Sequence, residues 1–270
     1  MDDKPASPLA MPEPWDLVAE GYVAENMWSF EQFATEALRR APATGDVLDV
    51  AAGPGSLSLL AARTARTVTA LDFAPGMLAQ LRQRAQAAGV HNVEAVRGDG
   101  QALTFADQRF DAAYSMFGLM FFPDPGRGLR ELHRVLRPNA RALIATWAPF
   151  ERTPALSALF GAMKAELPNS GIGERPMALS APDEIRALFA AAGFGACEVH
   201  EHTVTGPPVT AAELWRSFSR GGAPAVLMRR KIGEAGFAAL SEKLVRRMEQ
   251  TLGGGAIELR FLALLGIGER

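Results

Sequence analysis

The segment Asp49-Val50-Ala51-Ala52-Gly53-Pro54-Gly55 decides the fold of this chain. It follows the apolar residues Val47 and Leu48, so a short buried strand runs directly into a glycine turn. Glycines let the backbone approach a ligand closely, and the helix predicted at 55–64 would present unpaired N–H groups at its start. This order is typical of folds that hold nucleotide-like ligands. A purely structural strand-to-helix turn is the alternative that the segment alone leaves open.

Strand and helix patterns alternate on both sides of this turn. Strands that alternate with helices indicate a parallel sheet covered on both faces. We therefore predict an α/β fold, a Rossmann-like doubly wound sheet that is mostly parallel with an antiparallel last strand, plus a helical cap inserted in the C-terminal half. The predicted core strands are 46–50, 67–72, 93–97, 110–116 and 141–147, followed by 196–204 and 257–265.

The alternation stops after Trp147, and this change divides the chain. Residues 1–14 hold four prolines and are expected to be a loose tail. Ser180 is expected to cap a helix that ends at Gly193, and Thr210-Ala211-Ala212-Glu213 predicts a capping box. The segments we expect are an N-terminal tail and helices at 1–40, a ligand-binding core at 41–148, a cap insertion at 149–180, a core helix and strand at 181–205, cap helices at 206–252 and a final core strand at 253–270.

Composition resembles that of an ordinary soluble enzyme. The formal net charge of −2 gives no electrostatic reason to expect nucleic acid or an anionic membrane as a partner. No apolar run approaches the ~18 residues of a membrane helix, and the N-terminus does not resemble a secretion signal, so a cytoplasmic protein is expected. Cys197 is the only cysteine, which excludes a disulfide within the chain.

Two further carboxylates follow the next two strands. Asp72 ends the strand 67–72, and Asp99 lies between glycines after the strand 93–97. A carboxylate at the position of Asp72 can accept hydrogen bonds from both hydroxyls of an adenosine ribose. A carboxylate at the position of Asp99 can accept a hydrogen bond from an adenine amine. A helix cap and a turn residue are the respective structural alternatives. Because parallel strands end at one crevice, Asp49, Asp72 and Asp99 together are more specific for a nucleoside than any one of them.

These motifs resemble those of the class I S-adenosylmethionine (SAM)-dependent methyltransferases. The chain is most similar to the small-molecule methyltransferases of ubiquinone and menaquinone biosynthesis, over residues 15–150 and more loosely over 180–205. Ala51 departs from the family, which usually has a glycine there, and alanine suits the position only if its backbone avoids positive φ. The matching segments are Val47–Gly55, Val68–Leu78, Gly98–Leu103, Phe110–Phe117 and Leu129–Pro138.

The resemblance implies SAM as the cofactor and assigns its contacts. Gly53 and Gly55 would make room for the methionine part, Asp72 would hold the ribose, and Asp99 would accept from the adenine amine. Phe73 and Met77 would flank the adenine, and Ser115–Phe117 would pass beneath the sulfonium. The complete set of expected cofactor residues is Asp49, Ala51, Ala52, Gly53, Gly55, Asp72, Phe73, Met77, Asp99, Gly100, Gln101, Ser115, Met116 and Phe117.

The expected methyl acceptor is a small, largely apolar molecule. Methyl transfer from a sulfonium is an in-line displacement, so the protein mainly aligns the nucleophile and excludes water, and the cation favours aromatic neighbours. The resemblance also implies an N-terminal tyrosine near the methyl, which makes Tyr22 the candidate catalytic residue. Arginines of the cap (Arg175, Arg216, Arg220) suggest an anionic group on the acceptor. The candidate substrate residues are Tyr22, Phe117, Phe121, Trp147, Trp215 and Phe218, for each of which core packing is the alternative.

Two other functions remain open at this point. A nicotinamide-dependent Rossmann oxidoreductase would share the fold, although Ser58 stands where its third glycine is expected. A non-catalytic SAM-binding protein would keep the three carboxylates. His200 and His202 share one strand face, but no third ligand is evident, so we expect no metal. The expected partner is a small-molecule methyl acceptor, without nucleic acid or membrane, and a homodimer is left open.

Overall fold

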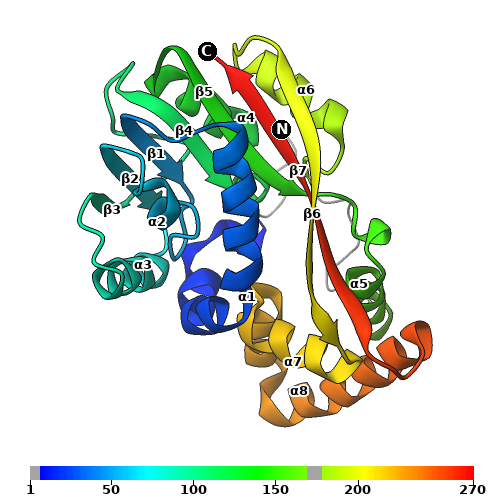
Figure 1. Ribbon diagram of the computed structural model, residues 1–270. Helices are drawn as coiled ribbons and strands as arrows, with labels where there is room; N and C mark the ends of the chain where they lie inside the picture. Colours follow the sequence, from blue (N-terminus) through cyan, green and yellow to red (C-terminus); the bar gives the residue numbers. More distant parts are fainter. Residues whose placement is uncertain (1–6, 169–177) are drawn as a thin grey trace.

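A computed structural model describes residues 7–168 and 178–270. Its centre is a seven-stranded sheet in the order β3-β2-β1-β4-β5-β7-β6 (Figure 1). The strands β1 to β5 run parallel to one another, whereas β7 is antiparallel to both β5 and β6. This confirms the predicted fold class. The strands are β1 (Asp46–Val50), β2 (Thr67–Asp72), β3 (Val93–Arg97), β4 (Phe110–Met116), β5 (Leu136–Trp147), β6 (Cys197–Val209) and β7 (Ile257–Glu269).

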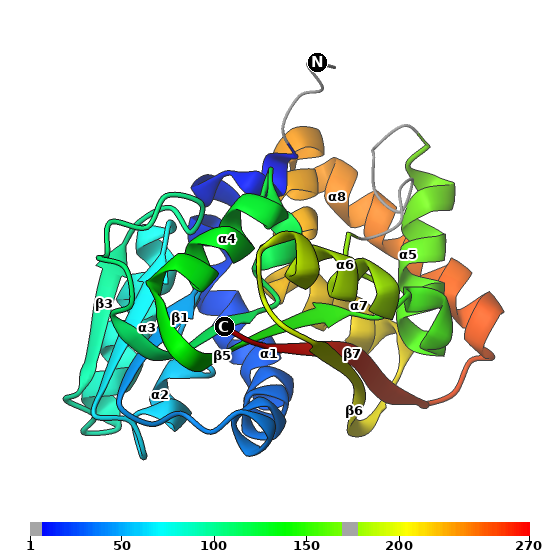
Figure 2. The same cartoon turned by 90° about the horizontal axis from the view of Figure 1, so that it is seen from above.

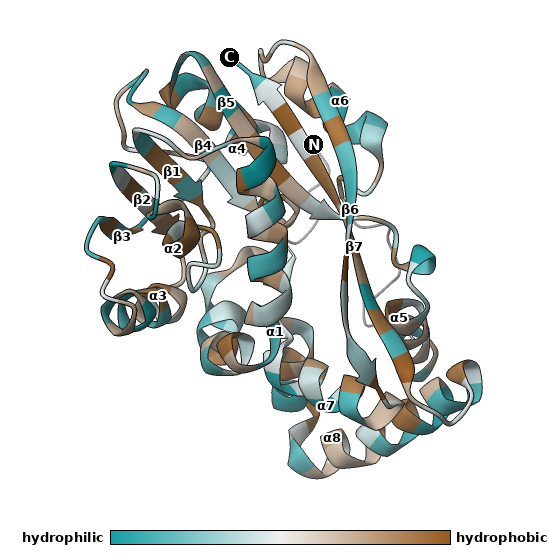
Figure 3. Cartoon of the chain, viewed as in Figure 1, coloured by the Kyte–Doolittle hydropathy of each residue, from teal (hydrophilic) through white to brown (hydrophobic). Residues whose placement is uncertain are grey.

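Helices cover both faces of the sheet, as Figure 2 shows from above. Three helices, α1 (Pro12–Arg40), α2 (Ser58–Ala61) and α3 (Pro75–Ala87), pack on one face, where Phe33, Leu57 and Leu81 are buried. The other face carries α4 (Pro125–Val135) and α6 (Pro182–Ala191). Apolar residues gather on the strands and hydrophilic ones lie along α1 and α6 (Figure 3). Burial of these apolar faces holds the layers together.

The last two strands leave the sheet and build a second apolar core. The residues of β7 before Ala263 pair only with β6, so the two strands continue as a ribbon (Figure 1). Around it lie α5 (Pro154–Glu166), α7 (Ala211–Gly221) and α8 (Ala223–Leu252), whose buried side chains form one hydrophobic cluster with Leu259. We call these three helices the cap. The predicted capping box of Thr210 and Glu213 opens α7.

Some local predictions are wrong. The tail is not loose throughout, because Pro8–Ala10 form the short helix η1 and α1 begins at Pro12. Ser180 does not cap α6; Ala181 is at the N-cap, and the Ser180 N–H donates to Glu184 Oε2 at 3.1 Å. The helix predicted at 55–64 spans only Ser58–Ala61. In the described part of the chain, no helix has the length and apolarity needed to cross a membrane.

Candidate functional site

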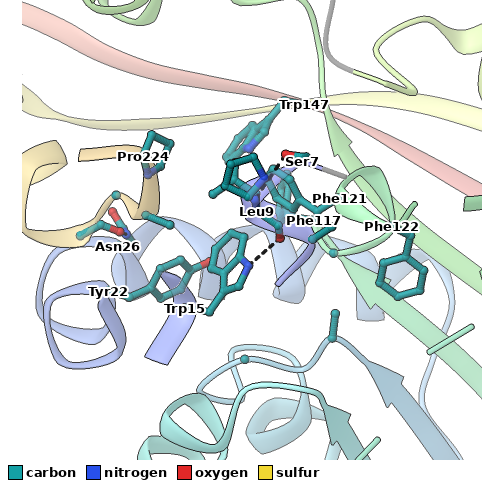
Figure 4. A pocket seen from close by; sticks show the side chains of 18 of the residues that line it. Ser7, Leu9, Trp15, Tyr22, Asn26, Phe117, Phe121, Phe122, Trp147 and Pro224 are labelled. Atoms are coloured by element: carbon teal, nitrogen blue, oxygen red, sulfur yellow. Dashed lines mark hydrogen bonds between the residues drawn. The ribbon is translucent and has the colours of Figure 1, made fainter. Parts of the chain in front are cut away.

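A cavity of about 1350 Å³ lies between the carboxyl ends of the parallel strands and the cap. Pockets for one small molecule commonly measure about 300–1,000 Å³, so this cavity has room for a cofactor and a second molecule. In Figure 4, Trp15, Tyr22 and Asn26 reach it from α1, Pro224 from the start of α8, and Phe117, Phe121 and Trp147 from the sheet side. The cavity therefore joins the strand ends, the N-terminal helix and the cap.

Most of the predicted site residues meet in this cavity. Five predicted residues do not line it: Trp215, which lies in the core of the cap, and Asp49, Ala52, Gly55 and Ser115. The predicted residues that line it are Tyr22, Ala51, Gly53, Asp72, Phe73, Met77, Asp99, Gly100, Gln101, Met116, Phe117, Phe121, Trp147 and Phe218.

Asp72 is a buried carboxylate that also organises the backbone around it. Its side chain accepts the Gly53 N–H at 2.8 Å through Oδ2 and the Ala74 N–H at 2.9 Å through Oδ1. Ala74 is the N-cap of α3 and no side chain caps this helix, so Asp72 is not a helix cap, and it lines the cavity. Only 4% of Asp72 is exposed, and this burial raises its pKa to about 6. Asp72 thus ties the glycine turn to α3.

Asp49 lies behind the glycine turn with one oxygen unused. Its Oδ2 accepts the Ser58 hydroxyl at 2.6 Å, and its residue is 1% exposed, so burial raises the pKa of the carboxyl to about 7. Among the described residues, Asp49 Oδ1 and the buried Ser115 Oγ have no hydrogen-bond partner. Buried polar atoms without partners are costly unless a ligand or water satisfies them. The glycine turn therefore has two buried acceptor atoms behind it that no described residue satisfies.

The two glycines of the turn have different roles. Gly53 has φ +55°, and a Cβ on it would meet no atom within 4 Å, so it leaves open space on the cavity side. Gly55 has φ +84°, and its Cβ would lie 2.9 Å from Leu81 Cδ1. The resemblance implies that Gly55 makes room for the methionine part of SAM. Its contacts instead show that the missing side chain lets the turn pack against Leu81 of α3.

Ala51 has a positive φ, the backbone conformation that an alanine at this position was expected to avoid. Its φ is +56°, a left-handed value that costs an L-residue about 1–2 kcal/mol. The alanine methyl is accommodated by Gly118, because a Cβ added to Gly118 would lie 2.2 Å from Ala51 Cβ. The missing family glycine at position 51 is thus matched by a glycine after β4.

This pairing predicts a coupled effect on stability. Gly118→Ala should lower the free energy of unfolding by about 1–3 kcal/mol, the usual cost of overpacking. The loss should be smaller in an Ala51→Gly background, where the opposing methyl is absent. Urea unfolding of the two single variants and the double variant measures the coupling energy. Equal losses in both backgrounds would contradict the contact.

A polar stripe on α1 faces the cavity. Tyr22, Asn26 and Ser29 are spaced by four and three residues, which places them on one helix face. Asn26 Nδ2 donates to the Gly221 carbonyl at 2.9 Å, and the Ser29 hydroxyl donates to the Asn26 carbonyl at 2.9 Å. Sequence reasoning missed Asn26 and Ser29, although helical spacing from Tyr22 points to both.

The Tyr22 phenol is held in its protonated form. Burial, followed by the nearby charge of Asp72, raises its pKa well above the ordinary value. Its ring stacks on Phe30 with centroids 5.3 Å apart. A phenol with a raised pKa donates a hydrogen bond but does not serve as a general base near neutral pH.

An aromatic wall adjoins Tyr22. Phe117 stacks on Trp147 with centroids 4.2 Å apart, and Phe117 has φ +59°, which is uncommon for a bulky residue. Trp15, which sequence reasoning missed, packs edge-on against Phe121 at 5.1 Å, and its indole N–H donates to the Leu9 carbonyl at 2.9 Å. This bond fixes η1 over the cavity. The Ser7-Pro8 pair, a common helix start, is the signal that could have revealed η1.

The cap side corrects two expectations. Phe218 lines the cavity, but Trp215 is 4% exposed and packs against Phe237 in the core of the cap, with ring centroids 5.7 Å apart. Arg216 does not line the cavity, and Arg220 pairs with Glu25 at 3.2 Å; Arg175 lies outside the described residues. The cations that do line the cavity are Lys164 and Lys231.

The raised pKa values predict two opposite responses to pH. Folding raises both carboxyl pKa values above the unfolded value of about 3.9, so the folded state binds protons more tightly between about pH 4 and 7. The ligand-free Tm should therefore fall as pH rises through this window.

The affinity for cationic SAM should rise over the same window, because the carboxyl groups lose their protons. For each carboxyl that must be deprotonated, the affinity rises by up to about tenfold per pH unit. Melting curves from pH 5 to 8 test both, and Asp49→Asn should flatten the ligand-free slope.

Comparison with known proteins supports the resemblance. A family model described as a methyltransferase domain matches residues 47–139. The demethylmenaquinone methyltransferase of Thermus thermophilus is 37% identical over 178 residues, which cover 58% of this chain and 77% of the relative. An uncharacterized protein of Mycobacterium tuberculosis, Rv1405c, is 32% identical over 226 residues, which cover 81% of this chain and 79% of the relative.

Solved structures share the fold. The YcgJ protein of Bacillus subtilis aligns with a TM-score of 0.60 at 21% identity, over 90% of this chain and 98% of that one. The [4+2]-cyclase SpnF aligns with a TM-score of 0.61 at 18% identity, over 98% and 97%. Together with the sequence relatives, they show that this chain belongs to the class I SAM-dependent methyltransferases, near the demethylmenaquinone methyltransferases, and uses SAM as its cofactor.

Proposed function

We propose that this methyltransferase acts on a small, largely apolar acceptor bound on the cap side of the cavity. The observation that carries the proposal is the continuation of the cavity past the strand ends into a region lined by side chains of the cap, among them Leu156, Phe160, Phe218 and Met228. The Thermus thermophilus relative, whose name indicates an apolar quinone precursor as substrate, supports the same class of acceptor.

The residues at the strand ends fit SAM. Asp72 and Asp99 supply carboxylates for the ribose hydroxyls and the adenine amine, Phe73 and Met77 supply apolar contacts, and Gly53 supplies open space. When bound, SAM supplies an activated methyl on a sulfonium. Phe117 and Trp147 offer aromatic surface that suits a cation and keeps water away from the acceptor.

Binding and transfer can be tested separately. Calorimetry with S-adenosylhomocysteine and with NADH should show binding of the first alone, since a nicotinamide oxidoreductase would bind the second. Transfer of labelled methyl from SAM to a panel of quinols and phenols, with polar amines and sugars as the contrast, should favour the apolar members. Binding of S-adenosylhomocysteine without transfer to any apolar acceptor would instead favour the non-catalytic alternative. A cytoplasmic location and a homodimer remain predictions from the sequence.

Tyr22 should position the acceptor through its protonated phenol. Tyr22→Phe removes one hydrogen-bond donor and keeps the stacking on Phe30, so kcat should fall by about tenfold, the value of one hydrogen bond. Because the phenol does not titrate near neutral pH, the pH dependence of kcat should keep its shape. A lost or shifted limb in that profile would show that Tyr22 transfers a proton.

A further inference from the structure

The charged side chains that line the cavity are few, and both cations lie on helices of the cap. Asp72 and Asp99 lie at the strand ends, where the cofactor is expected. Toward the cap the charged lining residues are Glu151 on the short helix η3 (Phe150–Arg152), Lys164 on α5 and Lys231 on α8. The cap side therefore presents two cations and one anion to a cavity whose other cap residues are largely apolar.

Lysine is scarce in this chain, which makes these two positions notable. Arginine supplies nearly all of the 28 basic residues; the lysines are Lys4, Lys164, Lys231 and Lys243. Two of these four line the cavity, whereas no arginine of the described residues does. A lysine ammonium is a compact point charge on a flexible stem, which suits a ligand anion that needs no fixed fork geometry.

The neighbouring cations have partners of their own. Next to Lys231, the Arg229 guanidinium lies 4.5 Å from the Phe237 ring centroid, and Arg230 forms an ion pair with Glu13. Near Lys164, Glu166 pairs with Arg247 at 2.6 Å. Within residues 7–168 and 178–270, neither Lys164 nor Lys231 has an acidic group within 4 Å. Both side chains are exposed at the cavity, so their charge is open to a ligand.

The two helices that carry the lysines also supply apolar residues to the cavity wall. Leu156 and Phe160 come from α5, the helix that carries Lys164, and Leu227 and Met228 come from α8, which carries Lys231. The helices α5 and α8 pack against each other in the cap. A lysine stem can lie along such a surface while its ammonium stays in water. An apolar molecule on the cap side would thus share the cavity with two exposed lysines.

We propose that Lys164 and Lys231 select an acceptor that carries an anionic group, such as a carboxylate, on an apolar body. The proposal rests on the proposed function, because it assigns the cap side of the cavity to the acceptor. The apolar body would occupy the region near Phe160 and Met228, and the anion would lie at the two lysines. Neutral analogues of the same shape would bind more weakly.

A matched pair of fluorescent probes tests the proposal without knowledge of the natural acceptor. The first, 1-anilinonaphthalene-8-sulfonate, is an aromatic anion, and the second, N-phenyl-1-naphthylamine, is its neutral counterpart. The Lys164→Gln, Lys231→Gln double variant should bind the anionic probe about tenfold more weakly, since two exposed charge contacts are lost. Its affinity for the neutral probe should stay unchanged, and added salt should weaken only the anionic probe.

Controls separate charge, shape and cofactor binding. Lys243→Gln removes an exposed lysine of α8 that does not line the cavity and should bind both probes as wild type does. Phe160→Ala should weaken both probes, which shows that they occupy this cavity. Equal affinity of the double variant and wild type for the anionic probe would overturn the proposal, as would an equal loss for both probes. Absence of S-adenosylhomocysteine binding by calorimetry would instead contradict the proposed function.

Discussion

Asp72→Ala should weaken SAM binding by at least about a hundredfold, the largest effect that we expect of any substitution at the cofactor end. Two hydrogen bonds to a charged group, each worth about 1.5–3 kcal/mol, would be lost from the ribose. The substitution also leaves the buried N–H groups of Gly53 and Ala74 without their acceptor, so the glycine turn itself should loosen. Calorimetric titration with S-adenosylhomocysteine measures the change in Kd.

Asp99→Ala is the matched control for this prediction. Asp99 lines the same cavity, but it is exposed, and its Oδ1 accepts only the Gln101 backbone and side-chain N–H groups. A carboxylate in contact with water loses less when it is removed, so the Kd should rise by only about three- to tenfold. If both variants lost the same affinity for S-adenosylhomocysteine, or if Asp72→Ala bound it as wild type does, the prediction would be contradicted. Burial and the contacts to the glycine turn would then not determine how much Asp72 contributes to binding.

The fold and the meeting of Asp72 and Asp99 in one cavity could be predicted because their signals are local. Each of Asp72 and Asp99 follows its own strand, and parallel strands bring their carboxyl ends together by topology alone. No long-range packing detail is needed to place them in one crevice. The prediction therefore needed only the strand pattern and the type of residue at each strand end.

The remaining features depend on contacts between distant segments. The left-handed backbone of Ala51 is compatible with its side chain only because a glycine stands at position 118. The position of η1 depends on a bond from Trp15, and the two cavity lysines come from different helices of the cap. A helix pattern identifies an apolar face but does not say which neighbour that face meets. For this reason the sequence predicts one role for Trp215 and Phe218, three residues apart, whereas only Phe218 borders the cavity.

Trp215→Ala should lower the free energy of unfolding by about 3–5 kcal/mol, the usual cost of truncating a buried tryptophan. Trp215 is 4% exposed among the buried side chains of the cap, with Phe218 and Phe237 within 6.0 Å between ring centroids. Phe218→Ala is the control, because Phe218 is half-buried and borders the cavity. Its cost should be smaller, since part of its surface already faces open space.

The two substitutions should separate stability from binding. Phe218→Ala should raise the KM for an apolar acceptor, whereas Trp215→Ala should act mainly through unfolding of the cap, measured by guanidinium denaturation. The cofactor end is built on the strand ends, and its side chains belong to clusters other than that of Trp215. S-adenosylhomocysteine should therefore bind the folded form of either variant with nearly wild-type affinity. If Trp215→Ala left the free energy of unfolding unchanged and altered only the KM for the acceptor, Trp215 would contact the substrate, as the sequence alone predicts.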